Sequence, residues 1–124
     1  MATGVGGGAA LASVVGVAFT PGDGTAFVTH AASHSVGRVT AGGSYTKNFA
    51  GLDGTGTYLD HGTGSSARFD RPIGICHDPT SATLLVADRD NNVFRRLDPA
   101  STAVTTAFGQ QPVAQHSNAP LTFQ

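Results

Sequence analysis

Oxygen-bearing side chains gather in the segment Asp88-Arg89-Asp90-Asn91-Asn92, where carboxylate and amide oxygens stand at alternate positions, as in a calcium-binding loop. A loop of the EF-hand type also needs a glycine at its sixth position and a glutamate at its twelfth, and the chain has Val93 and Pro99 there. Asp and Asn side chains commonly bond the backbone of the turn that contains them. We therefore expect Asp88 to end a strand and bond the following turn, and we predict no metal site.

Imidazole groups could serve as metal ligands or as a general base. Only two of the five histidines are closely spaced, and these two stand around an expected turn rather than on one face of a helix. We expect the histidines to be solvated or bonded to turns. They are His30, His34, His61, His77 and His116.

Arginine side chains could bind a carboxylate or a phosphate, because the guanidinium group matches both geometries. The chain shows no Ser-His-Asp order in a nucleophile context and no Cys/His zinc pattern, and its glycine cluster, Gly4 to Gly8, precedes a strand rather than a helix. We predict structural roles for the arginines, and neither a catalytic residue nor a cofactor. The arginines in question are Arg68, Arg71, Arg95 and Arg96.

Cys76 is the one cysteine of the chain, so it cannot form an internal disulfide. Its place in an expected inner strand predicts a buried, small, hydrophobic side chain. Nothing in the cysteine content indicates a disulfide-stabilised secreted module, and the sequence assigns no compartment.

The elements that carry these residues are repeated along the chain. A shift of 58 residues lays Gly4 to His61 over Gly62 to Ala119 without a gap. Turn glycines and apolar strand positions agree together in this register, which indicates a fold built from repeated units. Matching pairs include Gly16 with Gly74, Pro21 with Pro79, Val28 with Val86, Arg38 with Arg96 and Gly51 with Gly109.

Each repeat unit is expected to form four short strands. Two apolar runs are joined by a turn rich in Pro, Gly and Asp, and a more alternating third run and a threonine-rich fourth run follow. Four antiparallel strands with short turns form the blade of a β-propeller, so the expected fold class is all-β. The expected strands cover residues 14–19, 26–29, 36–39 and 45–49, and then 73–76, 84–87, 94–97 and 103–108.

The second unit carries an Ala-Arg-Phe triplet, a Pro-x-Gly-Ile strand, an Asp-Pro turn and a strand that ends in Val-Ala-Asp, and it thereby resembles an NHL repeat. The first unit departs from that pattern at Ala10, Val14, His30 and Gly37, where the family has arginine, proline, aspartate and arginine. The matching motif positions are Ala67, Arg68, Phe69, Pro72, Gly74, Asp78, Pro79, Asp88, Asn91 and Arg95.

The resemblance implies an incomplete propeller of about two blades. Residues 4–61 would form a degenerate NHL-like blade, residues 62–119 a second blade, and residues 120–124 the start of a third blade or a tail. The motif arginines would tie neighbouring strands and blades together. His77 and Asp78 would lie near the mouth of the propeller channel, where ligands commonly bind, although Asp78 is also expected to cap the Asp-Pro turn.

The expected function is that of a non-catalytic protein-interaction or scaffold module, acting within a larger protein or assembly. One alternative, also implied by the resemblance, is part of a propeller enzyme, a metal-dependent lyase or a lactonase-like hydrolase, whose other site residues lie in further blades. Single-stranded RNA binding is a third reading. It is disfavoured because seven basic side chains stand against eight acidic ones with no basic stripe, and because the chain has no tryptophan.

Length bounds the architecture, because the chain has 124 residues and closed propellers take typically about 4–8 blades. Two blades would leave two open apolar faces, which favours either a longer propeller or self-association that completes a ring, for example three copies giving six blades. Residues 9–19 have the apolar length of a signal-peptide core but lack a basic flank, so we expect a strand there. No run approaches the roughly 20 apolar residues of a membrane span.

Overall fold

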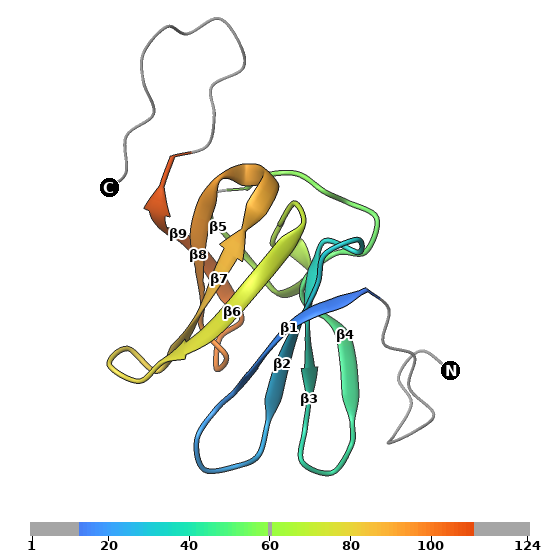
Figure 1. Cartoon of the computed structure of the whole chain (residues 1–124), viewed down its shortest axis with the longest axis vertical. Helices are drawn as coiled ribbons and strands as arrows, with labels where there is room; N and C mark the ends of the chain where they lie inside the picture. Colours follow the sequence, from blue (N-terminus) through green and yellow to red (C-terminus); the bar gives the residue numbers. More distant parts are fainter. Residues whose placement is uncertain (1–12, 60, 111–124) are drawn as a thin grey trace, which may run out of the picture.

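The computed structural model describes residues 13–59 and 61–110, and it consists of strands arranged in two antiparallel sheets with no closed barrel (Figure 1). The expected all-β class is confirmed. The expectations for the Gly4 to Gly8 lead-in, for His116 and for residues 120–124 lie outside the described residues.

Sheet 1 contains four strands whose order in the sheet follows their order in the chain. Each strand pairs antiparallel with the next, as the short turns between them require. Its strands are β1 (Val14–Phe19), β2 (Ala26–His30), β3 (Ser35–Val39) and β4 (Tyr45–Gly51).

Sheet 2 contains five strands in the order β5-β9-β8-β7-β6, so the expectation of four strands per unit was wrong here. The additional strand, β5 (His61–Thr63), pairs antiparallel with β9, and it was missed because three residues are too few to show an alternating pattern. A 3₁₀ turn, η2 (Gly64–Ser66), follows β5, and a second one, η3 (Arg89–Asn91), lies where the polar turn was expected. The other strands are β6 (Pro72–Asp78), β7 (Thr83–Asp88), β8 (Val93–Leu97) and β9 (Ala103–Gly109).

The 58-residue shift relates the backbones of the two sheets as well as their sequences. β8 and β9 begin and end 58 residues after β3 and β4. Residues with positive φ recur at the same distance, as in His34 (58°) and Asn92 (61°), or Gly51 (87°) and Gly109 (89°). We call two residues related by this shift repeat counterparts.

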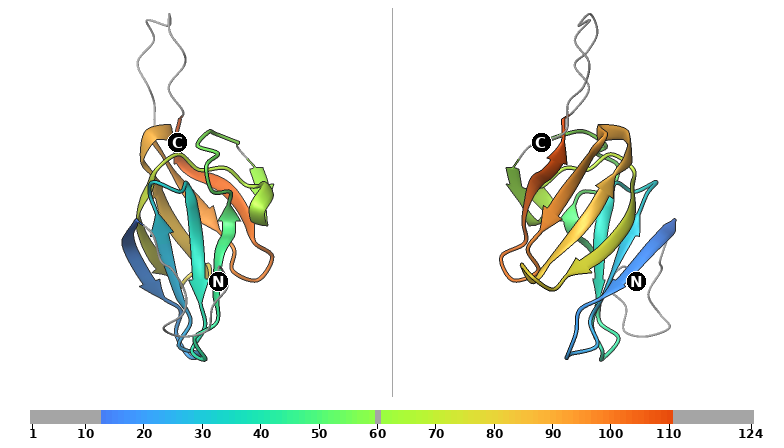
Figure 2. Two further views of the ribbon diagram at one scale, coloured as in Figure 1. Left: turned by 90° about the vertical axis from the view of Figure 1, so that its right-hand side faces the viewer. Right: turned by 60° about the vertical axis from the view of Figure 1, so that its left-hand side comes forward.

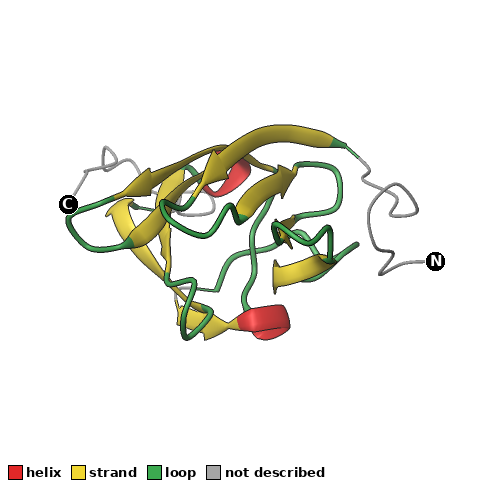
Figure 3. Ribbon diagram, turned by 90° about the horizontal axis from the view of Figure 1, so that it is seen from below, coloured by secondary structure: helices red, strands yellow, loops and turns green. Residues whose placement is uncertain are grey.

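The hydrophobic core lies between the sheets, and both sheets contribute to it. β1 and β2 lie against β6, so the edge strands β1 and β6 of the two sheets are neighbours although no ladder joins them (Figures 1 and 2). Figure 3 views the molecule from below and shows the strands joined by loops and turns, with η2 and η3 drawn as short helices. The core residues are Ala18, Phe27, Val36, Phe49 and Ala50 from sheet 1, and Ala67, Phe69, Leu84, Val86, Leu97 and Val104 from the second unit.

Gly16 is the point of closest approach between the sheets. A Cβ atom built at this position would lie 2.5 Å from the Ile73 carbonyl oxygen and 2.9 Å from Thr29 Oγ1. Thr29 Oγ1 in turn donates a hydrogen bond of 2.6 Å to the same Ile73 oxygen. Only a glycine lets the two backbones come this close, so the absence of a side chain at position 16 helps to define the packing.

Candidate functional site

A buried ionic network occupies the centre of the second unit. The Arg95 and Asp88 side chains are fully buried, and Arg95 Nη1 lies 3.2 Å from Asp88 Oδ2. Arg95 also donates hydrogen bonds to the backbone carbonyls of Arg68 and Leu59. The guanidinium group therefore joins β8 to β7 and to two loop segments that are distant in the sequence.

The Asp88 carboxylate accepts further hydrogen bonds. The Asp70 backbone N–H donates to Oδ1 at 2.7 Å, and Asn91 Nδ2 donates to Oδ2 at 2.8 Å. Asn91 Nδ2 also donates to the Thr57 carbonyl oxygen. Burial raises the pKa of the Asp88 carboxyl group, while the bonds from Asn91 and Asp70 and the charge of Arg95 oppose this shift.

Arg68 and Phe69 contact this network, whereas Pro79 lies in a cleft at the turn that follows β6. Ala67 and Phe69 are fully buried, and the Arg95 guanidinium carbon lies 5.6 Å from the centre of the Phe69 ring. Pro72 is buried at the start of β6, whereas Gly74 is exposed. Arg68 bonds only locally among the described contacts, to the carbonyl oxygens of Ser65 and Ala67.

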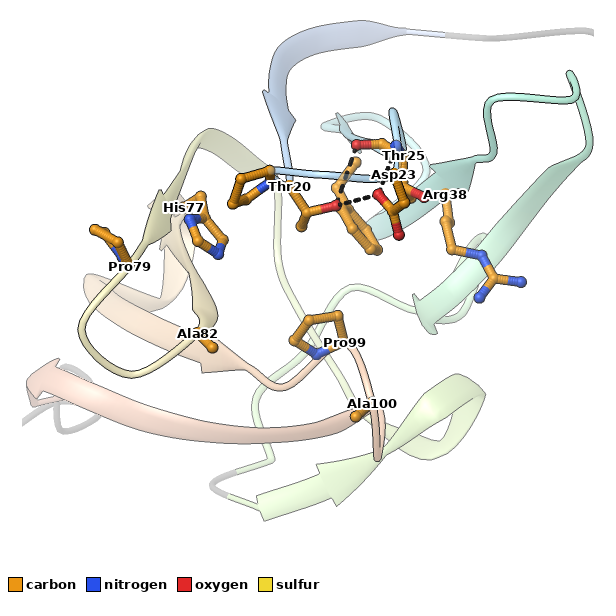
Figure 4. Close-up of a pocket in the computed structure, with 11 residues that line it drawn as sticks. Thr20, Asp23, Thr25, Arg38, His77, Pro79, Ala82, Pro99 and Ala100 are labelled. Carbon is orange, nitrogen blue, oxygen red and sulfur yellow. Dashed lines mark hydrogen bonds between the residues drawn. The ribbon is translucent and has the colours of Figure 1, made fainter.

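His77 and Asp78 lie at the end of β6, but the structure gives them different surroundings. His77 lines a cleft of about 490 Å³ where the turn ends of the two sheets meet, together with Thr20, Asp23, Arg38 and Pro99 (Figure 4). Asp78 bonds its own turn, since it accepts hydrogen bonds from Thr80 N and Ser81 Oγ. Those bonds and the bond from Arg96, with that from Ser81 the strongest, lower the pKa of the Asp78 carboxyl group.

The cleft contains a cationic side chain and a hydroxyl group, whereas its carboxylate is already hydrogen-bonded and is a weak base. Arg38 Nε is buried and finds no hydrogen-bond partner within the described part of the chain. The Asp23 carboxylate already accepts hydrogen bonds from Thr20 Oγ1 and from Thr25 N, which lower its pKa. Among residues 13–59 and 61–110, no group of three or more His, Cys, Asp or Glu side chains is placed to hold a metal ion.

Two histidines take part in specific contacts. His30 is fully buried and its Nε2 lies 2.9 Å from the Tyr45 hydroxyl, so the expectation of a solvated or turn-bonded side chain was wrong at this position. His30 ends β2 on the side of the sheet that carries Tyr45, and that ring covers it. His34 Nδ1 accepts a hydrogen bond from Arg71 N and lies 3.4 Å from Asp70, which bonds it to a turn as expected.

Two apolar surfaces lie open, one on each sheet. On sheet 1 the surface is formed by β1, whose Val15, Val17 and Phe19 side chains are 55%, 53% and 64% exposed. Such a row of large apolar side chains is uncommon on a protein that stays monomeric. We call this surface the β1 face.

The open surface of sheet 2, which we call the β6–β8 face, surrounds an apolar hollow of about 220 Å³. Phe94 and Phe108 lie beside each other on it with ring centres 6.3 Å apart, and each is 43% exposed. Cys76 is also exposed, so the expectation of a buried thiol was wrong. The hollow is lined by Gly74, Ile75, Cys76, Leu85, Ala87 and Phe94.

No functional role was predicted for Phe94 or Phe108, although both occupy apolar strand positions of the repeat, as their repeat counterparts Val36 and Ala50 do. No helix among the described residues has the length and hydrophobicity that crossing a membrane would need. No family model matches the chain, and no curated protein matches it.

Proposed function

We propose that this chain is a non-catalytic protein-interaction module, an NHL-like propeller segment that acts within a larger protein or assembly. The observation that carries the proposal is the β1 face, where three consecutive outward side chains of one strand are more than half exposed and apolar. Burial of apolar surface stabilises a complex by about 25 cal/mol for each Å² removed from water, so such a surface strongly favours association. The β6–β8 face supplies a second surface of the same kind.

The polar residues support a structural reading of the motif. Asp88, Arg95 and Asn91 bond one another and the backbone, so their polar atoms serve the fold. A buried network of this type holds strands in one arrangement and so keeps the faces around it fixed. The module would then present preformed surfaces rather than a reaction centre.

Site-specific photo-crosslinking tests the proposal. A photoreactive amino acid replaces Val17 in cells that make the protein, and the same replacement at Thr80, an exposed turn residue, is the control. We expect a covalent adduct to a protein, either another copy or a different polypeptide, from position 17 and not from position 80. An absence of protein adducts from position 17 would contradict the interaction role.

A second candidate is a ligand contact at the cleft, as part of a propeller enzyme that completes its site with residues of other blades. Arg38 and His77 line the same cleft, and a guanidinium group suits an anionic ligand. Titration with inorganic phosphate while the His77 imidazole signals are followed by NMR tests this reading. A saturable shift that is lost in Arg38→Met would support it, and unchanged signals would speak against it.

A further inference from the structure

The β6–β8 face is the repeat counterpart of a face that is covered in sheet 1. Val36 and Ala50 are fully buried against sheet 2, whereas their counterparts Phe94 and Phe108 are each 43% exposed. The same holds across the face, since Ala18 is buried and its counterpart Cys76 is exposed. The covered set is Gly16, Ala18, Phe27, Thr29, Val36 and Ala50, and the open set is Gly74, Cys76, Leu85, Ala87, Phe94 and Phe108.

On the β1 face the exposed residues belong to sheet 1, and their repeat counterparts in sheet 2 lie at the interface between the sheets. Ile75 of β6 packs against the core, and Ile73 meets Gly16 through its carbonyl oxygen, although the Ile73 side chain is 38% exposed. Their counterparts, Val17 and Val15, are exposed on sheet 1. Each open face of the chain is therefore the counterpart of one half of the interface that joins its own two sheets.

We propose that the β6–β8 face of one copy of this chain receives the β1 face of a second copy, in the arrangement that joins sheet 1 to sheet 2 within the chain. This inference rests on the proposed interaction role and names its partner. The contact joins two different surfaces, so it is head-to-tail and repeats from copy to copy. Such a contact closes into a ring when the rotation between copies permits closure.

At Gly74 the backbone of a second copy has room to approach as closely as the Ile73 backbone approaches Gly16 within the chain. Within the chain, Gly16 makes room for the Ile73 carbonyl oxygen. Among the described residues, a Cβ at its counterpart, Gly74, would meet only the Ala87 Cβ, at 3.8 Å, so this position is open toward the β6–β8 face. The Val15 carbonyl group of a second copy, the counterpart of Ile73, fits this opening.

Side-chain sizes differ between the two halves of the proposed contact. On the β1 face Val15, Val17 and Ala26 are smaller than their counterparts Ile73, Ile75 and Leu84, whereas Phe19 is larger than His77. On the β6–β8 face Phe94 and Phe108 are larger than Val36 and Ala50, whereas Leu85 and Ala87 are smaller than Phe27 and Thr29. Protein interfaces pack at the density of protein interiors, so the contact between copies needs its own side-chain packing rather than a copy of the internal one.

One hydrogen bond of the internal interface has no equivalent between copies. Thr29 Oγ1 donates to the Ile73 oxygen at 2.6 Å, but its counterpart is Ala87, which has no donor. The contact between copies is therefore weaker by one bond than the contact within the chain, and Ala87→Thr restores the missing donor.

Mixing two blocked variants tests the proposal. Gly74→Leu fills the receiving position, where a Cβ atom lies in ordinary contact with the Ala87 Cβ at 3.8 Å, and Val17→Asp places a charge on the entering face. Both positions are exposed, so circular dichroism should show native folding for each variant. Alone, each variant lacks one of the two surfaces and should stay monomeric at concentrations where the unmodified chain associates. Mixed together, they should form a discrete one-to-one dimer.

Alkylation of Cys76, read by intact mass, identifies which copy uses which face. In the mixture the Val17→Asp copy supplies its β6–β8 face, so its Cys76 should be protected, while Cys76 of the Gly74→Leu copy stays reactive. Ala87→Thr alone should tighten self-association by about fivefold, the effect of one net hydrogen bond.

Monomers in the mixture, equal reactivity of both thiols, or an unmodified chain that never associates would overturn the head-to-tail contact. Association of either blocked variant alone would overturn it as well. A crosslink from position 17 to a different protein, with no self-association, would leave the interaction role standing and remove only this inference.

Discussion

A glycine in one unit and its counterpart in the next have opposite surroundings. A Cβ at Gly16 would overlap the Ile73 carbonyl oxygen, whereas a Cβ at Gly74 would make one ordinary contact within the described residues, with the Ala87 Cβ at 3.8 Å. The same residue type thus defines a packed contact at one position and leaves a receiving surface at the other. Neither position requires positive φ, so the difference arises from packing alone.

This difference predicts unequal costs for the same substitution. Gly16→Ala should destabilise the chain by about 1–3 kcal/mol, because its Cβ would overlap the Ile73 carbonyl oxygen and force the sheets apart. Gly74→Ala should change the free energy of unfolding by no more than about 0.5 kcal/mol. Urea unfolding of both variants at low protein concentration checks this. Equal costs would mean that the sheets do not approach at Gly16 as described.

The buried ion pair should be costly to break. Arg95→Met removes the only cation beside the buried Asp88 among the described contacts and should reduce the free energy of unfolding by about 3–5 kcal/mol. Arg89→Met is the matched control, because the Arg89 side chain is 61% exposed and should contribute little. Thermal or urea unfolding measures both, and a loss of similar size in the two variants would argue against a structural role for Arg95.

The contribution of the Asp78 carboxylate to the free energy of unfolding should depend on pH. Its folded-state pKa lies below the ordinary value of 3.8, so the stabilisation is complete above that value and is lost as the pH falls through the folded-state pKa. Asp78→Asn should therefore be less stable than the unmodified chain at neutral pH, and the difference should shrink on acidification below 3.8. Unfolding curves at neutral and strongly acidic pH measure this difference, and a gap that is constant with pH would contradict it.

At the scale of elements, the alternation of apolar residues and the repeat together predicted eight of the nine strands of the described chain to within two residues at either end. The largest differences, of two residues, are at the ends of β4 and β6. β5 was missed because its pairing partner, β9, is far away in sequence. Exposure of Cys76 and burial of His30 could not be predicted, because they depend on which side of a sheet another element covers. The sequence pattern predicts that a segment forms a strand, but it does not show whether another sheet packs on one face of that strand or on both.

The open side of β6 can be tested with its own counterpart. Cys76 should react with a thiol reagent in the native chain, because it lies on the β6–β8 face. Ala18→Cys, made together with Cys76→Ala, places a thiol at the counterpart position, where Ala18 is 7% exposed. The second thiol should react at least about tenfold more slowly, since it needs local opening of the structure. Equal rates at low protein concentration would show that the sheets do not cover β1 as described.

At the scale of the whole molecule, two sheets share one core and leave one apolar face each. The sequence indicated the two units and the prospect of open faces, and it left open whether a longer propeller or further copies would cover them. It could not indicate which side of each sheet stays open, because that depends on the packing of β1 and β2 against β6. The two open faces are the basis of the proposed head-to-tail association. That the associated chains form an NHL-like propeller is likewise a proposal.

The most direct measurement is the solution mass of the unmodified chain by light scattering over a wide range of concentration, with Gly74→Leu measured in parallel. We predict that the mass of the unmodified chain rises with concentration to whole multiples of one chain, while the variant keeps the mass of a single chain. A single-chain mass at every concentration, or the same association in both proteins, would contradict the account.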